Sequence, residues 1–108
     1  MVEYAFRMDT IFASLADPVR RDILERVAQF ELTVNEIALH YDISLAAVSK
    51  HLKVLELADL ITKRKEGRKV MVMANREAIT QAEEYLAGYR QYQQRRFDAL
   101  EQTINERE

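Results

Sequence analysis

The chain has 108 residues, of which 48% are hydrophobic and 31% are charged, and this balance suits one packed domain rather than a disordered segment. The absence of cysteine excludes disulfides and thiolate metal sites, and no apolar run reaches the ~18 residues needed to cross a membrane. The first ten residues contain an early acid and no apolar core typical of a secretory signal, so we expect a cytoplasmic protein with no membrane partner.

The formal net charge of −2 disfavours a nucleic-acid partner, but the charges are unevenly distributed. Residues 50–75 carry seven Lys or Arg side chains against three acids, a net charge of +4, while the rest of the chain has a net charge of −6. A basic patch on an acidic body is the pattern expected of a local polyanion site, although any single run of this kind is more often a solvated face.

Two glycines and one proline predict a mostly helical chain with short connections. The first 15 residues contain one apolar stripe at helical spacing, formed by Met8, Ile11, Phe12 and Leu15. Asp17-Pro18 then predicts an N-cap followed by proline in the first helical position. We expect a second helix from there to about Gln29, with its buried side formed by Ile23, Leu24 and Val27.

Residues 33–36 form a capping-box pattern, in which Thr33 caps a helix and Glu36 reaches back to it. This pattern predicts a third helix of about two turns over residues 34–41. Asp42 is expected in the following turn because Asp tolerates the left-handed conformation. Ser44 predicts the next N-cap, and the fourth helix buries Val48, Leu52 and Leu55.

Apolar and β-branched residues around Glu66-Gly67 predict a two-stranded hairpin over about 60–65 and 68–74. Ile61, Val70 and Val72 are the candidates for packing it against the helices. From residue 75 onward the pattern predicts one helix of ~28 residues, or ~42 Å. A helix of that length extends beyond so small a domain, so a partner chain is expected to cover its far apolar stripe.

The stretch "SLAAVSKHLKVLELADLI" has two interpretations, an amphipathic core helix or a helix that enters DNA. A short capped helix, a turn and a second capped helix predict a helix-turn-helix, and the basic hairpin after it predicts a winged helix. The first turn of the second helix bears small side chains outward, and a helix must be slim there to enter the ~12 Å major groove. Its predicted contact residues are Ser44, Leu45, Ala46, Ala47, Ser49, Lys50, His51 and Lys53, and those of the wing are Lys63, Arg64, Lys65, Arg68 and Lys69.

Over residues 9–74 the chain resembles the ArsR family of dimeric bacterial transcriptional repressors, through "LADPVRRDIL", "SLAAVSKHLKVLELADLI" and "KEGRKVMVMA". The resemblance implies a winged helix-turn-helix fold, which is mostly helical with a small β-hairpin. Its order is four helices, the hairpin and a last helix. It also implies a homodimer through the first and last helices, bound to an inverted-repeat operator in double-stranded DNA. Residues 1–108 are then one domain, with 75–106 as the dimerisation helix. The predicted interface residues are Met8, Ile11, Phe12, Leu86, Tyr89, Phe97, Leu100 and Ile104.

The metal sites of the family are not expected in this chain. Thr33 and Asn35 stand where many members have a pair of cysteines, and residues 75–108 contain no histidine. We therefore predict a branch without metal, with no cofactor and no effector identifiable from the sequence. No catalytic constellation is present, so an enzyme is not expected. The alternative to a DNA-binding repressor is a winged-helix module that uses its basic wing to bind an acidic protein.

Overall fold

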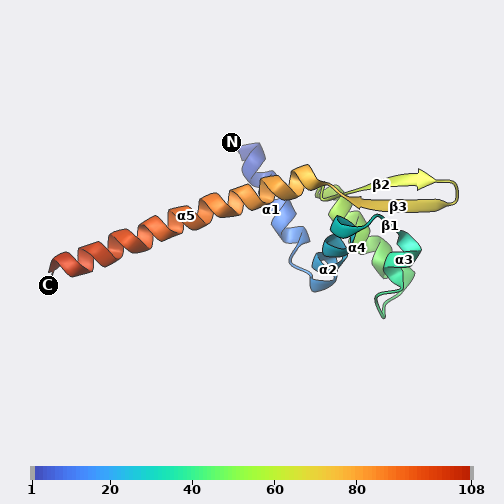
Figure 1. Cartoon of the computed structure of the whole chain (residues 1–108), viewed down its shortest axis with the longest axis horizontal. Helices are drawn as coiled ribbons and strands as arrows, with labels where there is room; N and C mark the ends of the chain where they lie inside the picture. The colour runs from blue at the N-terminus through green and yellow to red at the C-terminus, as the bar shows by residue number, and fades with distance from the viewer. Residues whose placement is uncertain (1, 108) are drawn as a thin grey trace.

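The computed structural model describes residues 2–107, so the first and last residues of the predicted domain lie outside the described residues. The elements are α1 (Val2–Ser14), α2 (Pro18–Gln29), β1 (Leu32–Thr33), α3 (Val34–Ala38), α4 (Leu45–Leu57), β2 (Ile61–Glu66), β3 (Lys69–Ala74) and α5 (Arg76–Arg107). The helices α1–α4 and a three-stranded sheet form a body from which α5 projects as a rod (Figure 1). The molecule measures 69 × 30 × 22 Å as a result.

One hydrophobic core joins the elements of the body. Helices α1, α2 and α4 each contribute at least two buried side chains, and α3 contributes one, Ile37. The core consists of Met8, Ile11, Ile23, Val27, Ile37, Val48, Leu52, Leu55, Ala58, Leu60, Ile61, Val72, Ala78 and Ala82. The predicted mostly helical winged helix is confirmed, because the hairpin packs on the helices through Ile61 and Val72.

The three predicted helix caps are all present. The Asp17 carboxylate accepts a hydrogen bond from the Val19 amide at 2.8 Å. The Thr33 hydroxyl accepts from the Glu36 amide at 3.1 Å, and the Glu36 carboxylate accepts from the Thr33 amide at 2.9 Å, which completes the capping box. The Ser44 hydroxyl accepts from the Ala47 amide at 3.1 Å. Such contacts satisfy amides that the first helical turn leaves without partners.

The prediction for the helix–turn segment was partly wrong. α3 ends at Ala38 rather than near residue 41, whereas Asp42 lies in the turn before α4, as predicted. Asp42 is not left-handed: among the described residues, the non-glycine residue with a positive φ is Asp59, at 61°. Asp59 follows α4, where the Leu60 amide donates to the Leu55 carbonyl and the Asp59 amide donates to the Glu56 carbonyl. That pair of hydrogen bonds is a Schellman motif, which requires a left-handed residue just past the helix.

The sheet contains one strand more than predicted. Each end of β2 and β3 lies within one residue of the predicted end of that strand. The turn between the two strands contains Gly67, whose φ is 63°. β1 adds to the other side of β3, with Leu32 opposite Val72 in an antiparallel pair. A strand of two residues has no sequence periodicity, which is why the pattern of the chain did not predict it.

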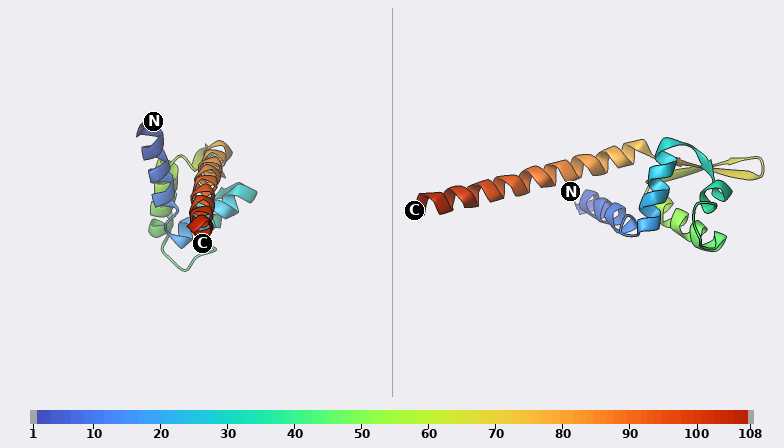
Figure 2. Two further views of the ribbon diagram at one scale, coloured as in Figure 1. Left: turned by 90° about the vertical axis from the view of Figure 1, so that its left-hand side faces the viewer. Right: turned by 60° about the horizontal axis from the view of Figure 1, so that its bottom comes forward.

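The long helix α5 has 32 residues and is attached to the body only at its start. Ala78 and Ala82 are buried there, and their small side chains let the helix approach the core closely. The Arg76 guanidinium donates to the Ala28 carbonyl of α2 at 2.9 Å. α1 lies beside this first part of α5, whereas the remainder extends away from the body (Figure 2).

We predict that Ile37→Ala lowers the free energy of unfolding by about 2–5 kcal/mol, because Ile37 is the only fully buried side chain that anchors the five-residue α3. Urea unfolding measures this change. The matched control is Leu39→Ala at the end of the same helix, where the side chain is 86% exposed and a change within about 0.5 kcal/mol is expected. Equal effects of the two substitutions would contradict the described core.

Candidate nucleic-acid interface

Helix α4 has one buried side and one exposed side. Val48, Leu52 and Leu55 are at most 1% exposed and fix the orientation of the helix on the core. The opposite side is open, and its exposed residues are Ser44, Leu45, Ala46, Ser49, Lys50 and Lys53, with Ala47 partly buried. The first turn therefore offers the small side chains of Ser44 and Ala46 together with the exposed Leu45, and two lysines follow further along the helix.

His51 lies on the flank of α4 that faces α2. Its Nδ1 lies 3.4 Å from a guanidinium nitrogen of Arg20, so the predicted contact residue already has a partner inside the chain. A guanidinium only donates, so a hydrogen bond between these two groups requires Nδ1 to be the acceptor. Arg20 also donates to the Ser14 carbonyl at 2.5 Å. This arginine therefore links the end of α1 to the middle of α4.

The five basic side chains of the wing fall into two groups. Lys63 forms an ion pair with Glu56 of α4 at 3.5 Å. Arg64 contacts Glu31 at 3.3 Å and Glu66 at 3.2 Å, and these acids raise the pKa of its guanidinium. These two cations are partly compensated by acids, and two of these acids, Glu31 and Glu56, lie outside the hairpin.

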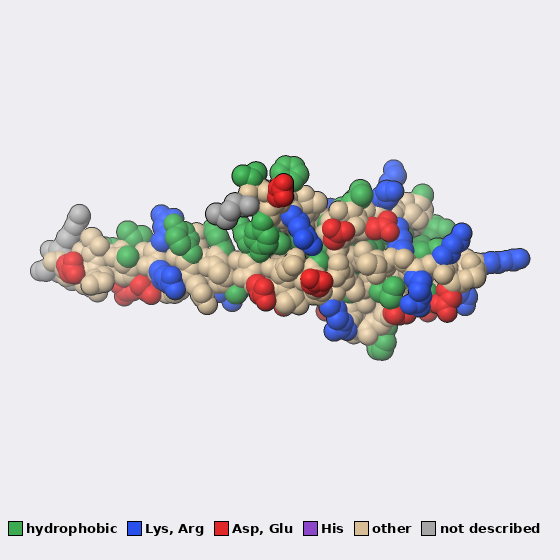
Figure 3. Space-filling view, turned by 90° about the horizontal axis from the view of Figure 1, so that it is seen from above, with side chains coloured by type: hydrophobic (Ala, Val, Ile, Leu, Met, Phe, Trp, Pro, Cys, Tyr) green, Lys and Arg blue, Asp and Glu red, His purple; other side chains and the backbone are tan. Residues whose placement is uncertain are grey.

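The remaining wing cations, Lys65, Arg68 and Lys69, are exposed, and no acid lies within ion-pair distance of them among residues 2–107. Arg68 occupies the hairpin turn, next to Gly67. Lys and Arg side chains surround the tip of the wing in the space-filling view (Figure 3). The uncompensated positive charge of the wing is therefore concentrated at its far end.

A surface hollow separates the wing from α3 and α4. The wing side is formed by Arg68, Lys69 and Val70, and the helix side by Ser49 and the start of α3. The hollow thus has the cations Arg68 and Lys69 on one wall, and the Ser49 hydroxyl and the Glu36 carboxylate on the other. The cations of the wing side are the groups of this hollow that could contact a phosphate.

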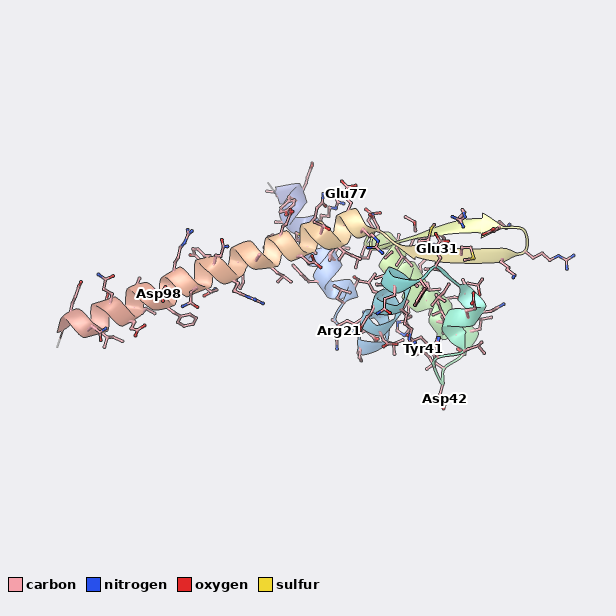
Figure 4. The ribbon with its side chains drawn as sticks, in the orientation of Figure 1. Arg21, Glu31, Tyr41, Asp42, Glu77 and Asp98 are labelled. Carbon is pink, nitrogen blue, oxygen red and sulfur yellow. The ribbon has the colours of Figure 1, made fainter. Side chains whose placement is uncertain are left out.

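A polar cluster holds the turn between α3 and α4 against α2, and the sequence interpretation missed it. The Tyr41 hydroxyl donates to the Asp22 carboxylate at 2.5 Å, and the Arg26 guanidinium donates to the same oxygen at 2.8 Å. The Arg26 guanidinium also lies 5.9 Å from the centre of the Tyr41 ring. Figure 4 labels Tyr41, which lies toward α2, and Asp42, which projects from the turn. The sequence does contain one signal of this cluster: Asp22 and Arg26 are four residues apart on one helix, a spacing that favours an ion pair.

The cluster changes the acid–base properties of its members. The hydrogen bond from Tyr41, followed by that from Arg26, holds the pKa of Asp22 below its usual value. Burial and the hydrogen bond to Asp22 raise the pKa of Tyr41 to about 12. At neutral pH Tyr41 is therefore a proton donor and Asp22 is an ionised acceptor, which is the arrangement that holds the turn.

The predicted interface residues fall into two groups. Met8 and Ile11 are fully buried in the core of their own chain, so the prediction that they lie at an intermolecular surface does not fit this structure. The apolar stripe in the sequence predicted that this face of α1 is buried. It did not show whether the same chain or a partner chain covers the face. Phe12 is partly buried, with its ring centre 5.8 Å from that of Tyr85. The exposed members are all on α5, and they are Leu86, Tyr89, Phe97, Leu100 and Ile104.

Among the residues that the structure describes, no three His, Cys, Asp or Glu side chains are grouped so that they could hold a metal ion. His40 is exposed beside Tyr41, whereas His51 lies on α4. No helix in the described part of the chain is both long and apolar enough to span a membrane.

The elements described above define a winged helix-turn-helix protein, and comparisons with known proteins identify its family. A family model described as a helix-turn-helix domain matches residues 15–64. The chain is 32% identical over 68 residues to the transcriptional repressor SdpR of Bacillus subtilis (strain 168). The aligned region covers 63% of this chain and 76% of that protein. The chain is also 35% identical over 72 residues to the arsenical resistance operon repressor of Staphylococcus xylosus. The aligned region covers 67% of this chain and 69% of that protein.

Solved structures agree with these relatives. An ArsR-like transcriptional regulator from Rhodococcus sp. RHA1 superposes with a TM-score of 0.80 at 25% identity, over 94% of this chain and 95% of the other. The ArsR family transcriptional regulator RHA00566 superposes with a TM-score of 0.76 at 32% identity, over 83% of this chain and 93% of the other. The chain therefore belongs to the ArsR family of winged helix-turn-helix DNA-binding transcriptional regulators, as its motifs predicted.

We predict that Asp22→Asn makes the protein less sensitive to acid. A pKa that folding lowers adds stability above the unfolded value of about 3.9, and this stability is lost as the pH falls through the folded value. Asparagine keeps an oxygen acceptor for Tyr41 but cannot be protonated in this range. Urea unfolding between about pH 6 and pH 2 should show a smaller loss of stability for the variant than for the natural chain. Parallel pH curves would contradict the assignment.

Proposed function

We propose that the chain binds an operator in double-stranded DNA as a homodimer and represses transcription. The observation that carries the proposal is the exposed first turn of α4 beside a wing whose tip cations, among residues 2–107, form no ion pair. α4 would enter the major groove, with Ser44, Ser49 and Lys50 able to bond base edges or phosphates. Repression is supported by the relatives that are named repressors.

The proposal gives the other parts of the interface separate roles. Lys53 would meet the DNA backbone, and Lys65, Arg68 and Lys69 would contact the phosphates beside the groove that α4 occupies. Ala46 and Ala47 offer methyl groups that can pack on the methyl group of thymine. Nε2 is the His51 nitrogen that would remain available to DNA, since Nδ1 faces Arg20.

We propose further that the chain acts as a single winged-helix unit whose last helix forms the dimer. The exposed apolar side chains of α5 support this, since Phe97 is 64% exposed, Leu100 is 57% exposed and Ile104 is 60% exposed. A structural relative, the winged helix-turn-helix domain Mb0332 from Mycobacterium bovis, is described as homodimeric. A dimer would present two copies of α4, so operator half-sites should lie about one helical turn, or a multiple of it, apart.

The wing is expected to supply affinity with little discrimination between sequences. Arg68→Ala should weaken binding to specific and non-specific duplexes alike and lower the salt dependence of binding by about one unit. Arg64→Ala is the matched control, because Arg64 already pairs with Glu31 and Glu66 and should change the slope less. Fluorescence anisotropy over a salt series measures both. A change of operator preference in the Arg68 variant would indicate base or groove-width readout instead.

The oligomeric state tests the dimer directly. Leu100→Asp should convert the dimer to a folded monomer, because it places a charge in the exposed apolar stripe far from the core of the body. Gln102→Asp, on the opposite side of the same turn, is the control and should remain dimeric. Sedimentation equilibrium measures the mass of each. A stable dimer of the Leu100 variant would show that the interface lies elsewhere.

A further inference from the structure

Arg20 is a residue of α2 whose side chain reaches both α1 and α4. Its Nε donates to the Ser14 carbonyl at the end of α1 at 2.5 Å, and one Nη lies 3.5 Å from the Ala13 carbonyl. The other Nη lies 3.4 Å from Nδ1 of His51, which is 31 residues away on α4. Arg20 is partly buried, whereas its neighbour Arg21 is exposed. The Arg20 guanidinium therefore lies between α1 and the helix that we propose to meet DNA.

The cap at the start of α2 fixes the backbone from which this side chain extends. The Asp17 carboxylate accepts hydrogen bonds from the Val19 amide at 2.8 Å and from the Arg20 amide at 3.3 Å. Pro18 occupies the first turn of the helix, where its restricted φ suits the helical conformation. The Arg20 side chain thus starts from a defined position, and contacts with two other helices hold its far end.

His51 lies at the edge of the surface of α4 that we propose to meet DNA. Ala47 precedes it by four residues, so the two side chains lie on the same flank of the helix. Ala47 belongs to the first turn of α4, and Lys50, next to His51 in the chain, is exposed. Nδ1 of the ring faces Arg20, so the ring nitrogen that points away from α2 is Nε2.

A guanidinium determines which protonation state of a histidine ring it can bond. Arginine only donates hydrogen bonds, so the contact with Arg20 requires an unprotonated Nδ1. A neutral imidazole has one protonated nitrogen, and the hydrogen bond made by the other nitrogen selects it. The proton of a neutral His51 ring bonded in this way is on Nε2. This nitrogen is then a donor, as contact with a phosphate oxygen requires.

We propose that Arg20 is a positioning residue for operator binding and that it acts through His51. The inference rests on the proposed function, because it concerns the DNA contact of His51. Arg20 holds the imidazole in one orientation, with Nε2 as the donor to a DNA phosphate. It also ties the ring to the end of α1, so the group is in place before DNA binds. A side chain ordered in advance loses less conformational freedom on binding.

The tautomer of His51 provides the first test. The chain has two histidines, so in the His40→Gln variant every imidazole signal comes from His51. His40 is exposed beside Tyr41 and outside the proposed interface, so this variant should fold and bind DNA normally. Nitrogen NMR at about pH 8, where an ordinary histidine is neutral, should show an unprotonated Nδ1. Addition of Arg20→Lys should produce a mixture of tautomers. A proton on Nδ1 before that change, or no effect of it, would overturn the proposal.

The second test measures the affinity for a duplex selected from random sequences with the natural protein. Arg20→Lys keeps the charge, but one ammonium group cannot bond α1 and His51 together as a planar guanidinium does. The variant should bind about threefold to tenfold more weakly, the range that corresponds to loss of one hydrogen bond. In a chain that already carries His51→Ala, Arg20→Lys should change the affinity by less than about twofold, because its effect passes through the missing ring.

Arg21 provides the matched control. Its guanidinium donates to the Leu15 carbonyl at 2.8 Å, so it also bonds the chain at the end of α1. Figure 4 labels this side chain, near the loop between α1 and α2. Within residues 2–107 it forms no hydrogen bond with α4. Arg21→Lys should therefore leave the affinity nearly unchanged. An equal loss from Arg21→Lys, or a loss from Arg20→Lys that persists without the ring of His51, would overturn the proposal.

The outcomes separate this inference from the proposed function. A natural chain that binds no selected duplex would overturn the proposed function itself. A natural chain that binds, but in which the effects of Arg20→Lys and His51→Ala are independent, would overturn only the role of Arg20. Circular dichroism and thermal unfolding establish that each variant is folded. If Arg20→Lys does not fold, the protonated nitrogen of His51 in the His40→Gln chain still supports or overturns the proposal.

Discussion

Burial of one side of α4 is the constraint on which the rest of the structure depends. Val48, Leu52 and Leu55 face the core, so the other side of the helix, with Ala46, is turned outward. Fully burying a side chain of this size contributes about 1.5–3 kcal/mol, so rotation of the helix by a quarter turn would be costly. The orientation of the surface that we propose to meet DNA is thus set by the apolar side of the same helix.

Several polar contacts outside the core refine that orientation. Tyr41 and Asp22 attach the turn before α4 to α2, and Arg20 connects the end of α1 with His51 on α4. These contacts link α4 to the helices α1 and α2. The position of α4 on the body is therefore determined by α1 and α2 as well as by the core.

Charge has a different role from packing in this chain. The acidic excess lies outside residues 50–75, and some of those acids, such as Glu31, neutralise wing cations close to the body. The wing tip keeps its charge at Lys65, Arg68 and Lys69. Uncompensated charge at the end of a hairpin can approach a DNA backbone, whereas a compensated pair near the body contributes little to binding.

Local signals in the sequence predicted local structure well. The caps at Asp17, Thr33 and Ser44 depend on residues no more than three positions apart, and all are present. The hairpin ends were predicted within about one residue, since β-branched residues flank a glycine turn.

Features that depend on distant partners were not predicted. β1 exists because β3 pairs with it, and the contact between Tyr41 and Asp22 joins residues 19 positions apart. Periodicity placed Met8 and Ile11 on a buried face but did not show that their own chain covers it. Likewise, the ion pair of Lys63 with Glu56 joins a strand to a helix and is invisible in the pattern of the hairpin.

The central claim is that the outward side of α4 reads operator DNA, and Ala46→Glu tests it most directly. Ala46 is exposed in the slim first turn, so the variant should keep its thermal stability and its dimeric mass. Binding to a duplex selected from random sequences with the natural protein should be lost, because a bulky negative side chain cannot enter the major groove beside phosphates. Unchanged affinity for the selected duplex in a folded Ala46→Glu dimer would contradict the account.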